Sequence, residues 1–151
     1  MKRILFSGDG SGGDLIPLIL MAREFKRAGY DVRVCGSSEF SRIAEGFEVP
    51  FEGHPHSYSK IYLDNQRSGY IHNIRENIRH QQMLFQGEFD VLSKIAPDYD
   101  VLINFLAEIF VPSIAEAFSL PNIKLYTFPV IRSDRYAPPS GLPYVTENKY
   151  I

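Results

Sequence analysis

The stretch FSGDGSGGDLIP, residues 6–17, follows directly on the opening MKRIL, and its first residue completes the short apolar run Ile4–Phe6. An apolar run that ends at a glycine cluster is typical of a buried parallel strand followed by a tight turn. Leu15 then opens a series of apolar residues at helical spacing, which stops at Gly29, a residue type that commonly ends a helix. The stretch therefore predicts a strand, a glycine turn and a helix in close succession.

The rest of the chain continues this alternation. We expect further strands at residues 31–35, 49–53, 100–105 and 122–128, and further helices at 39–47, from Tyr70 to Leu92 and at 109–120. Strands that alternate with helices form right-handed βαβ units and a parallel sheet. The sequence therefore predicts an α/β fold, a Rossmann-like doubly wound parallel sheet over residues 1–130. Residues 131–151 are rich in Pro and Gly and are expected to form an irregular tail or the start of an interdomain linker.

Composition narrows the class of protein. The chain has 151 residues, of which 44% are hydrophobic and 23% charged, as in a globular domain. A net charge of −2 without a basic segment argues against a nucleic-acid partner. Cys35 is the only cysteine, which excludes an internal disulfide framework and favours the cytoplasm. No apolar run approaches the roughly 20 residues of a transmembrane helix, while peripheral contact with a membrane stays open.

The glycine turn matches G-x-G-x-x-G, the dinucleotide fingerprint, at Gly8, Gly10 and Gly13. Backbone N–H groups at the start of a helix favour a phosphate, and glycines let the backbone approach it closely. The turn is also explained if the glycines only allow a tight, solvated connection. A stand-alone NAD(P)- or nucleotide-binding module is therefore one hypothesis for this chain.

Two details argue against NAD. A dinucleotide domain carries a carboxylate for the ribose at the end of its second strand, and here that place falls on residues 35–38, CGSS, with Glu39 a little late. Asp14 and Pro17 favour a helix that begins after the glycines, with Asp14 as N-cap. Ser37 and Ser38, with Arg33 nearby, are compatible with a cofactor that carries a 2′-phosphate, so this alternative stays open.

Residues 12–45, GGDLIPLILMAREFKRAGYDVRVCGSSEFSRIAE, resemble the opening of family 1 glycosyltransferases of the GT-B fold. Gly13-Asp14-Leu15, Pro17, Ala28-Gly29-Tyr30 and Phe40 occupy the places of the family pattern. The segments EVPFEG (48–53) and SIAEAFSLPNIKLY (113–126) resemble its later parts. A more distant resemblance links the glycine loop to the lipid-linked sugar transferases of family 28.

The resemblance implies the N-terminal, acceptor-binding half of an inverting transferase. In that family the second half holds most of the nucleotide-sugar, which is a donor substrate, so no cofactor is expected. The family's donor motif is absent from these 151 residues. We therefore expect a C-terminal donor-binding domain in cis or in trans, a small-molecule or lipid acceptor, and no activity from this half alone.

The resemblance also implies site residues. Asp14 matches the position of an aspartate proposed as catalytic base in bacterial members, although it is equally explained as a helix cap. Gly10, Ser11, Gly12 and Gly13 would bind the diphosphate through backbone N–H groups. Asn104 stands where plant members carry an aspartate that supports a catalytic histidine, and is expected only to cap a strand end.

The segment after the third strand is expected to contribute the acceptor pocket, because it varies with the acceptor in this family. Its candidate residues are Tyr58, Tyr62, His72 and Phe85. His54 and His56 lack cysteine or acidic partners at metal-ligand spacing, so we expect solvent-exposed loop histidines and no metal site.

Overall fold

The computed structural model describes residues 2–57, 70–105 and 110–126, and for residues 70–77, 80 and 81 the backbone alone. Tyr58, Tyr62 and the predicted tail at 131–151 lie outside this part, so the domain boundary at 130 stays a prediction. Among the described residues, no helix is long and apolar enough to cross a bilayer.

Five parallel strands form one sheet in the order β3-β2-β1-β4-β5. The strands are β1 (Arg3–Ser7), β2 (Asp31–Ser37), β3 (Phe51–His54), β4 (Val101–Phe105) and β5 (Asn122–Leu125). The helical segments are α1 (Gly12–Arg27), η1 (Ser38–Phe40), α2 (Ser41–Gly46), α4 (Tyr70–Ile95), η2 (Ala96–Asp98) and α5 (Val111–Ala117). The predicted doubly wound α/β fold is confirmed.

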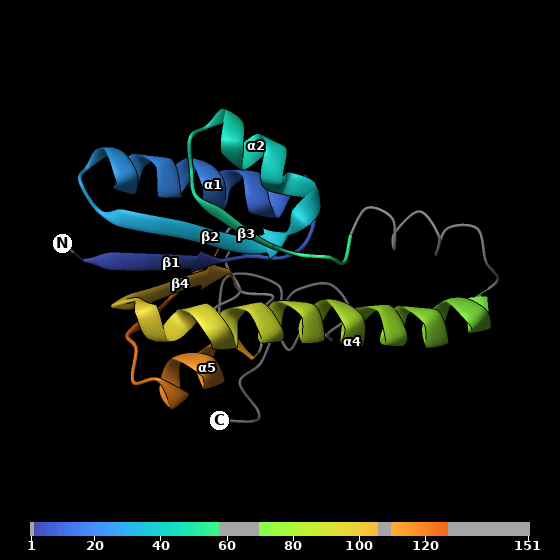
Figure 1. Cartoon of the computed structure of the whole chain (residues 1–151). Coiled ribbons are helices and arrows are strands. Elements are labelled where there is room, and N and C mark those ends of the chain that lie inside the picture. Colours follow the sequence, from blue (N-terminus) through green and yellow to red (C-terminus); the bar gives the residue numbers. More distant parts are fainter. Residues whose placement is uncertain (1, 58–69, 106–109, 127–151) are drawn as a thin grey trace, which may run out of the picture.

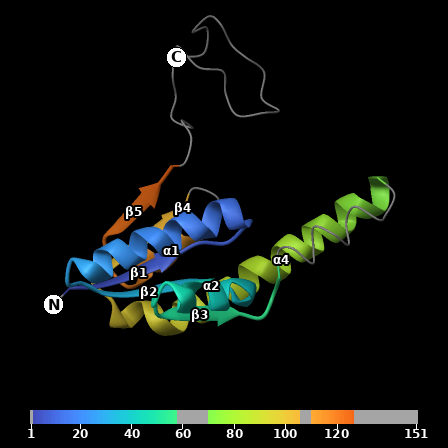
Figure 2. The ribbon, with the colours of Figure 1, turned by 90° about the horizontal axis from the view of Figure 1, so that it is seen from above.

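Helices cover both faces of the sheet (Figure 1). The helices α1 and α2 lie on one face, and α4 and α5 lie on the other. The first turns of α4 project past the carboxyl ends of the strands, as Figure 2 also shows. The strand order reverses direction between β1 and β4, and ligands of open α/β sheets bind at such a switch point, outside the carboxyl ends of the strands.

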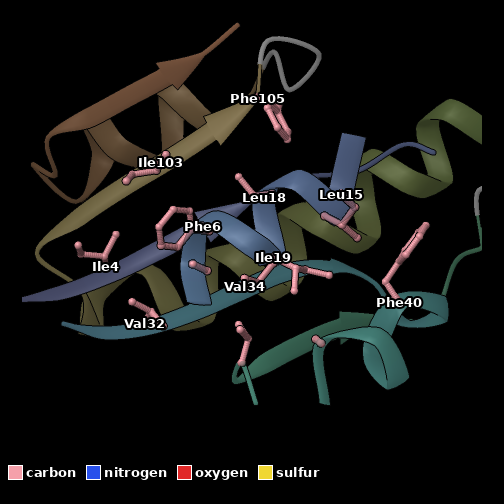
Figure 3. Packing of buried hydrophobic residues seen from close by; sticks show 13 residues of the cluster. Ile4, Phe6, Leu15, Leu18, Ile19, Val32, Val34, Phe40, Ile103 and Phe105 are labelled. Atoms are coloured by element: carbon pink, nitrogen blue, oxygen red, sulfur yellow. The ribbon is translucent and has the colours of Figure 1, made fainter. Parts of the chain in front are cut away.

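Strand alternation divides the apolar core into two layers. Figure 3 shows the layer between the sheet and α1, where Phe6, Leu18 and Val34 are fully buried. Leu5 and Leu102 point to the other face and pack against α4 and α5. Removing a buried Phe or Leu side chain typically costs about 2–5 kcal/mol, so each layer contributes substantially to folding.

The start of α1 differs from the sequence prediction. The helix begins at Gly12 with Ser11 as N-cap, so Asp14 is the third helical residue and not the cap. Ser11 and Asp14 have the S-x-x-D spacing of a capping box, which ties the carboxylate back to the Ser11 backbone. The far end agrees with expectation, because Gly29 follows the C-cap at φ +91°, a backbone conformation that favours glycine.

Candidate functional site

The three glycines of the fingerprint, Gly8, Gly10 and Gly13, serve different purposes at the junction of β1 and α1. A Cβ on Gly8 would lie 2.7 Å from Leu18 Cδ2, so Gly8 allows α1 to pack closely on the strand end. Gly10 adopts φ +132°, and a Cβ there would lie 2.8 Å from Asp14 Oδ2. Gly13 is exposed, and its Cβ would meet only Ser11 Oγ, at 3.4 Å. The outer side of the loop is therefore open to a ligand.

A second glycine on β2 fixes the base of this loop. The backbone N–H of Gly8 donates to the carbonyl of Cys35 over 3.1 Å. A Cβ on Gly36 would lie only 2.5 Å from the Gly8 carbonyl oxygen. The ends of β1 and β2 therefore approach each other as closely as backbone atoms allow.

Asp14 lies half-buried at the mouth of the loop. Its Oδ2 accepts hydrogen bonds from the Ser11 backbone N–H (3.0 Å) and the Ser11 hydroxyl (2.9 Å). Oδ1 accepts no hydrogen bond within the described part of the chain. The two bonds hold the carboxylate in one orientation and leave Oδ1 able to accept a proton or a hydrogen bond from a hydroxyl group.

Asp9 is a second carboxylate of the loop that the sequence prediction missed. Its Oδ1 accepts the Gly10 N–H over 2.9 Å. Its Oδ2 lies 3.6 Å from Nε2 of His54, and the Asp9 side chain is 10% exposed. The loop thus binds two carboxylates through its own N–H groups, Asp9 through the Gly10 N–H and Asp14 through the Ser11 N–H.

The prediction of solvent-exposed histidines is wrong. His54 is the last residue of β3 and is 0% exposed, and His56 is half-buried. Both side chains pack against α4 at Gly87, where a Cβ would lie 2.5 Å from Cδ2 of the His56 ring and 3.5 Å from His54 Cβ. The hydroxyl of Ser37 donates to the His56 carbonyl over 2.8 Å. A glycine on a helix distant in sequence therefore creates the space in which the histidines are buried.

Buried polar side chains follow the carboxyl edge of the sheet on the α4 face. The Ser7 hydroxyl donates to Oε1 of buried Glu88 over 2.6 Å, a length typical of a hydrogen bond to a carboxylate. Asn104 lies beside Ser7 in register, is fully buried and bonds to the Phe105 carbonyl and to Asn122. No group of three His, Cys, Asp or Glu suited to a metal occurs among the described residues.

Comparison with known proteins finds similarity to glycosyltransferases in sequence and in fold. No family model matches the sequence. A sterol 3-beta-glucosyltransferase of Saccharomyces cerevisiae (strain YJM789) is 26% identical over 136 residues, which cover 84% of this chain and 11% of the relative. The corresponding enzyme of Yarrowia lipolytica (strain CLIB 122 / E 150) is 28% identical over 134 residues, which cover 84% of this chain and 9% of that relative. The chain thus spans about a tenth of the length of these curated relatives.

Solved glycosyltransferase structures contain the same fold. SsfS6 from Streptomyces sp. SF2575 superposes with a TM-score of 0.63 at 18% identity, over 82% of this chain and 39% of that enzyme. CalG4, the calicheamicin glycosyltransferase, superposes with a TM-score of 0.64 at 12% identity, over 82% of this chain and 32% of that enzyme. The chain has the fold of an N-terminal GT-B glycosyltransferase domain. In these neighbours the GT-B domain is one part of a larger polypeptide.

The end of β2 in this GT-B domain does not suit a dinucleotide. The carboxylate of Glu39, the nearest acid, accepts the Ser57 hydroxyl over 2.8 Å. Arg33 lies four residues before the end of β2 and pairs with Glu52 over 3.1 Å, away from the carboxyl edge. However, α1 begins within the fingerprint, so the expectation that it begins after the glycines is wrong and no longer argues against NAD.

One predicted acceptor residue of the GT-B domain lies on a groove. Phe85 is half-buried on α4 and makes an edge-on contact with Phe110, with ring centres 5.7 Å apart. The described lining of this groove of about 470 Å³ consists of Gln82, Phe85, Gln86, Phe89 and Phe110. Phe110 directly precedes α5, so the groove opens near the carboxyl edge. His72 lies on α4 where only the backbone is described, and Tyr58 and Tyr62 lie outside the described residues.

Proposed function

We propose that this domain is the acceptor-binding half of an inverting, nucleotide-sugar-dependent glycosyltransferase. The observation that carries the proposal is the match of 82–84% of the chain to part of known glycosyltransferases. The donor-binding half would belong to the same polypeptide or to a partner chain. These 151 residues alone would then bind acceptor without transferring sugar.

Asp14 is the proposed catalytic base. In inverting transfer the acceptor hydroxyl attacks the anomeric carbon, the base takes the hydroxyl proton and the nucleoside diphosphate departs. The Ser11 contacts orient the Asp14 carboxylate through Oδ2, so Oδ1 can accept the acceptor hydroxyl. A positioned base contributes roughly 10²–10⁴-fold to the rate.

The glycine loop is proposed to face the diphosphate. Gly12 and Gly13 are the first residues of α1, and the first N–H groups of a helix have no partner within it. The helix dipole adds partial positive charge at this position. The Gly10 and Ser11 N–H groups bond to Asp9 and Asp14 here, so Gly12 and Gly13 are the donors most accessible to an anion.

The acceptor is proposed to be a hydroxyl on a largely apolar molecule such as a sterol. Both curated relatives are sterol glucosyltransferases by name. The groove at Phe85, Phe89 and Phe110 offers apolar surface with amide groups at its side, as a pocket for a mainly apolar ligand does. Tyr58, Tyr62 and His72 are proposed to extend this surface.

A chimera tests the proposal. Residues 1–151 replace the matched segment of the S. cerevisiae sterol 3-beta-glucosyltransferase, and transfer from UDP-sugars to sterols is measured. We expect transfer by the chimera, a loss of roughly 10²–10⁴-fold in the Asp14→Asn chimera, and no transfer by the isolated chain. Binding of a fluorescent sterol by the isolated chain provides a second readout that does not require the chimera to fold.

Titration with NADH and NADPH tests the alternative. Tight binding of either dinucleotide, abolished by Gly12→Val, would establish a dinucleotide-binding module and overturn the glycosyltransferase proposal. Weak or absent binding of both is the result expected of an acceptor half.

A further inference from the structure

His54 is a buried histidine whose ring is not satisfied. It is 0% exposed, and neither ring nitrogen has a hydrogen-bond partner among the described residues. Leaving a buried polar group unpaired is unfavourable, and most such groups in native proteins are paired. The nearby Ser37 hydroxyl is committed to the His56 carbonyl, and the His56 ring centre lies 6.1 Å from that of His54. These neighbours leave the His54 ring without a donor or acceptor of its own.

The polar atom that His54 faces is Oδ2 of Asp9. The separation from Nε2 is 3.6 Å, which exceeds the longest ordinary N–H···O hydrogen bond by about 0.4 Å. The other oxygen of Asp9 holds the Gly10 N–H over 2.9 Å. The Asp9 carboxylate therefore lies between the Gly10 N–H, to which it is hydrogen-bonded, and Nε2 of His54, to which it is not.

The Gly10 position makes this arrangement relevant to a ligand. Gly10 belongs to the loop proposed to face the donor diphosphate, and its N–H is occupied by the chain's own carboxylate. An arriving phosphate oxygen would compete with Asp9 for that N–H and would also be repelled by its charge. A small rotation of Asp9 toward His54 would free the Gly10 N–H, lessen the repulsion and give Nε2 of the buried ring a hydrogen-bond partner.

We propose that Asp9 and His54 form a positioning pair in which Asp9 exchanges the Gly10 N–H for His54 Nε2–H when a diphosphate enters the glycine loop. His54 does not touch the ligand and acts through Asp9. The inference rests on the proposed function, because it assigns the glycine loop to a diphosphate. Hydrogen bonds at active sites are often long in the free protein and shorten only when the ligand is bound, as required here.

Nuclear magnetic resonance of the isotopically labelled chain tests the exchange, with inorganic pyrophosphate as probe. We expect millimolar binding that shifts the Gly10 amide, together with a His54 Nε2–H signal typical of a hydrogen bond to a carboxylate. This observation on the unaltered chain does not depend on the folding of any variant. The proposal would be overturned if pyrophosphate did not bind. It would also be overturned if saturating pyrophosphate left the Gly10 amide or the His54 Nε2–H signal unchanged.

Three variants separate positioning from structure. His54→Leu removes the donor, and pyrophosphate binding should weaken about tenfold. His54→Gln keeps an N–H donor, and its affinity for pyrophosphate should stay within about threefold of that of the original chain. His56→Gln is the matched control and should bind pyrophosphate as the original chain does. Equal affinity of the His54→Leu and original chains would contradict the exchange. Sugar transfer by the chimera is measured separately, so a failed exchange is distinguishable from a failed proposal of function.

Discussion

Gly87 provides a sharp test of how α4 packs against the end of β3. Glycine within a helix is usually unfavourable, and Gly→Ala there stabilises by about 1 kcal/mol. At Gly87, however, a Cβ would lie 2.5 Å from His56 Cδ2 and 3.2 Å from its Nε2. Carbon atoms in contact lie about 3.5–4.0 Å apart, so the His56 ring would have to move by about 1 Å.

The opposing effects set the expected magnitude. Overpacking of this kind costs about 1–3 kcal/mol, which exceeds the gain in helix propensity. We therefore expect Gly87→Ala to lower the free energy of unfolding by about 1 kcal/mol. In a His56→Ala background the steric conflict is removed, and Gly87→Ala should raise the free energy of unfolding by about 1 kcal/mol. The coupling between the two sites is then about 2 kcal/mol.

Urea denaturation followed by circular dichroism measures all four proteins of this cycle. Gly46→Ala is the matched control, because no heavy atom lies within 4 Å of the position of its Cβ, and it should stabilise by at most about 1 kcal/mol. If Gly87→Ala stabilises the original chain as much as the His56→Ala chain, the described packing of α4 on β3 is wrong.

Three further predictions concern the loop and a tyrosine beside the sheet. Asp14→Ala should destabilise the chain by about 1 kcal/mol in urea denaturation, because Ser11 loses its acceptor, whereas Asp14→Asn should destabilise less and still abolish most transfer by the chimera. Gly10→Ala should cost about 1–3 kcal/mol by the same assay, since alanine is strained at φ +132°. Burial raises the pKa of Tyr99 above 10.0, although Arg33 and Arg3 oppose the shift. The unfolded chain therefore ionises first, stability should fall as the pH rises through 10.0 toward the higher folded value, and Tyr99→Phe should reduce that fall in alkaline urea titrations.

The fold could be predicted because its signals are local. Apolar runs such as Ile4–Phe6 mark strands, and the helical spacing from Leu15 and the stop at Gly29 mark α1. The start of α1 was also readable, since Ser11 and Asp14 have capping-box spacing, but the preference of aspartate for the N-cap position led to the wrong residue.

The buried histidine and its partners could not be predicted in the same way. The sequence GHPH (53–56), which itself contains a Gly and a Pro, is typical of an exposed loop. His54 is buried because Gly87, distant along the chain, lets α4 approach β3 closely. Asp9 and Glu88 carry no local signal either, since their significance comes from contacts between separate elements. Such contacts become visible only once the sheet order is known.

The close approach of Gly8 to both Leu18 and Gly36 limits how this domain can move. The Gly8 carbonyl oxygen lies against Gly36 of β2 and its α-carbon lies against Leu15 and Leu18 of α1, so the base of the loop is held between β2 and α1. Backbone rearrangement on ligand binding is thereby confined to the few residues between Gly8 and the first turn of α1. In the proposed enzyme, closure of the active site would then require rigid-body travel of the donor half toward a nearly stationary acceptor half.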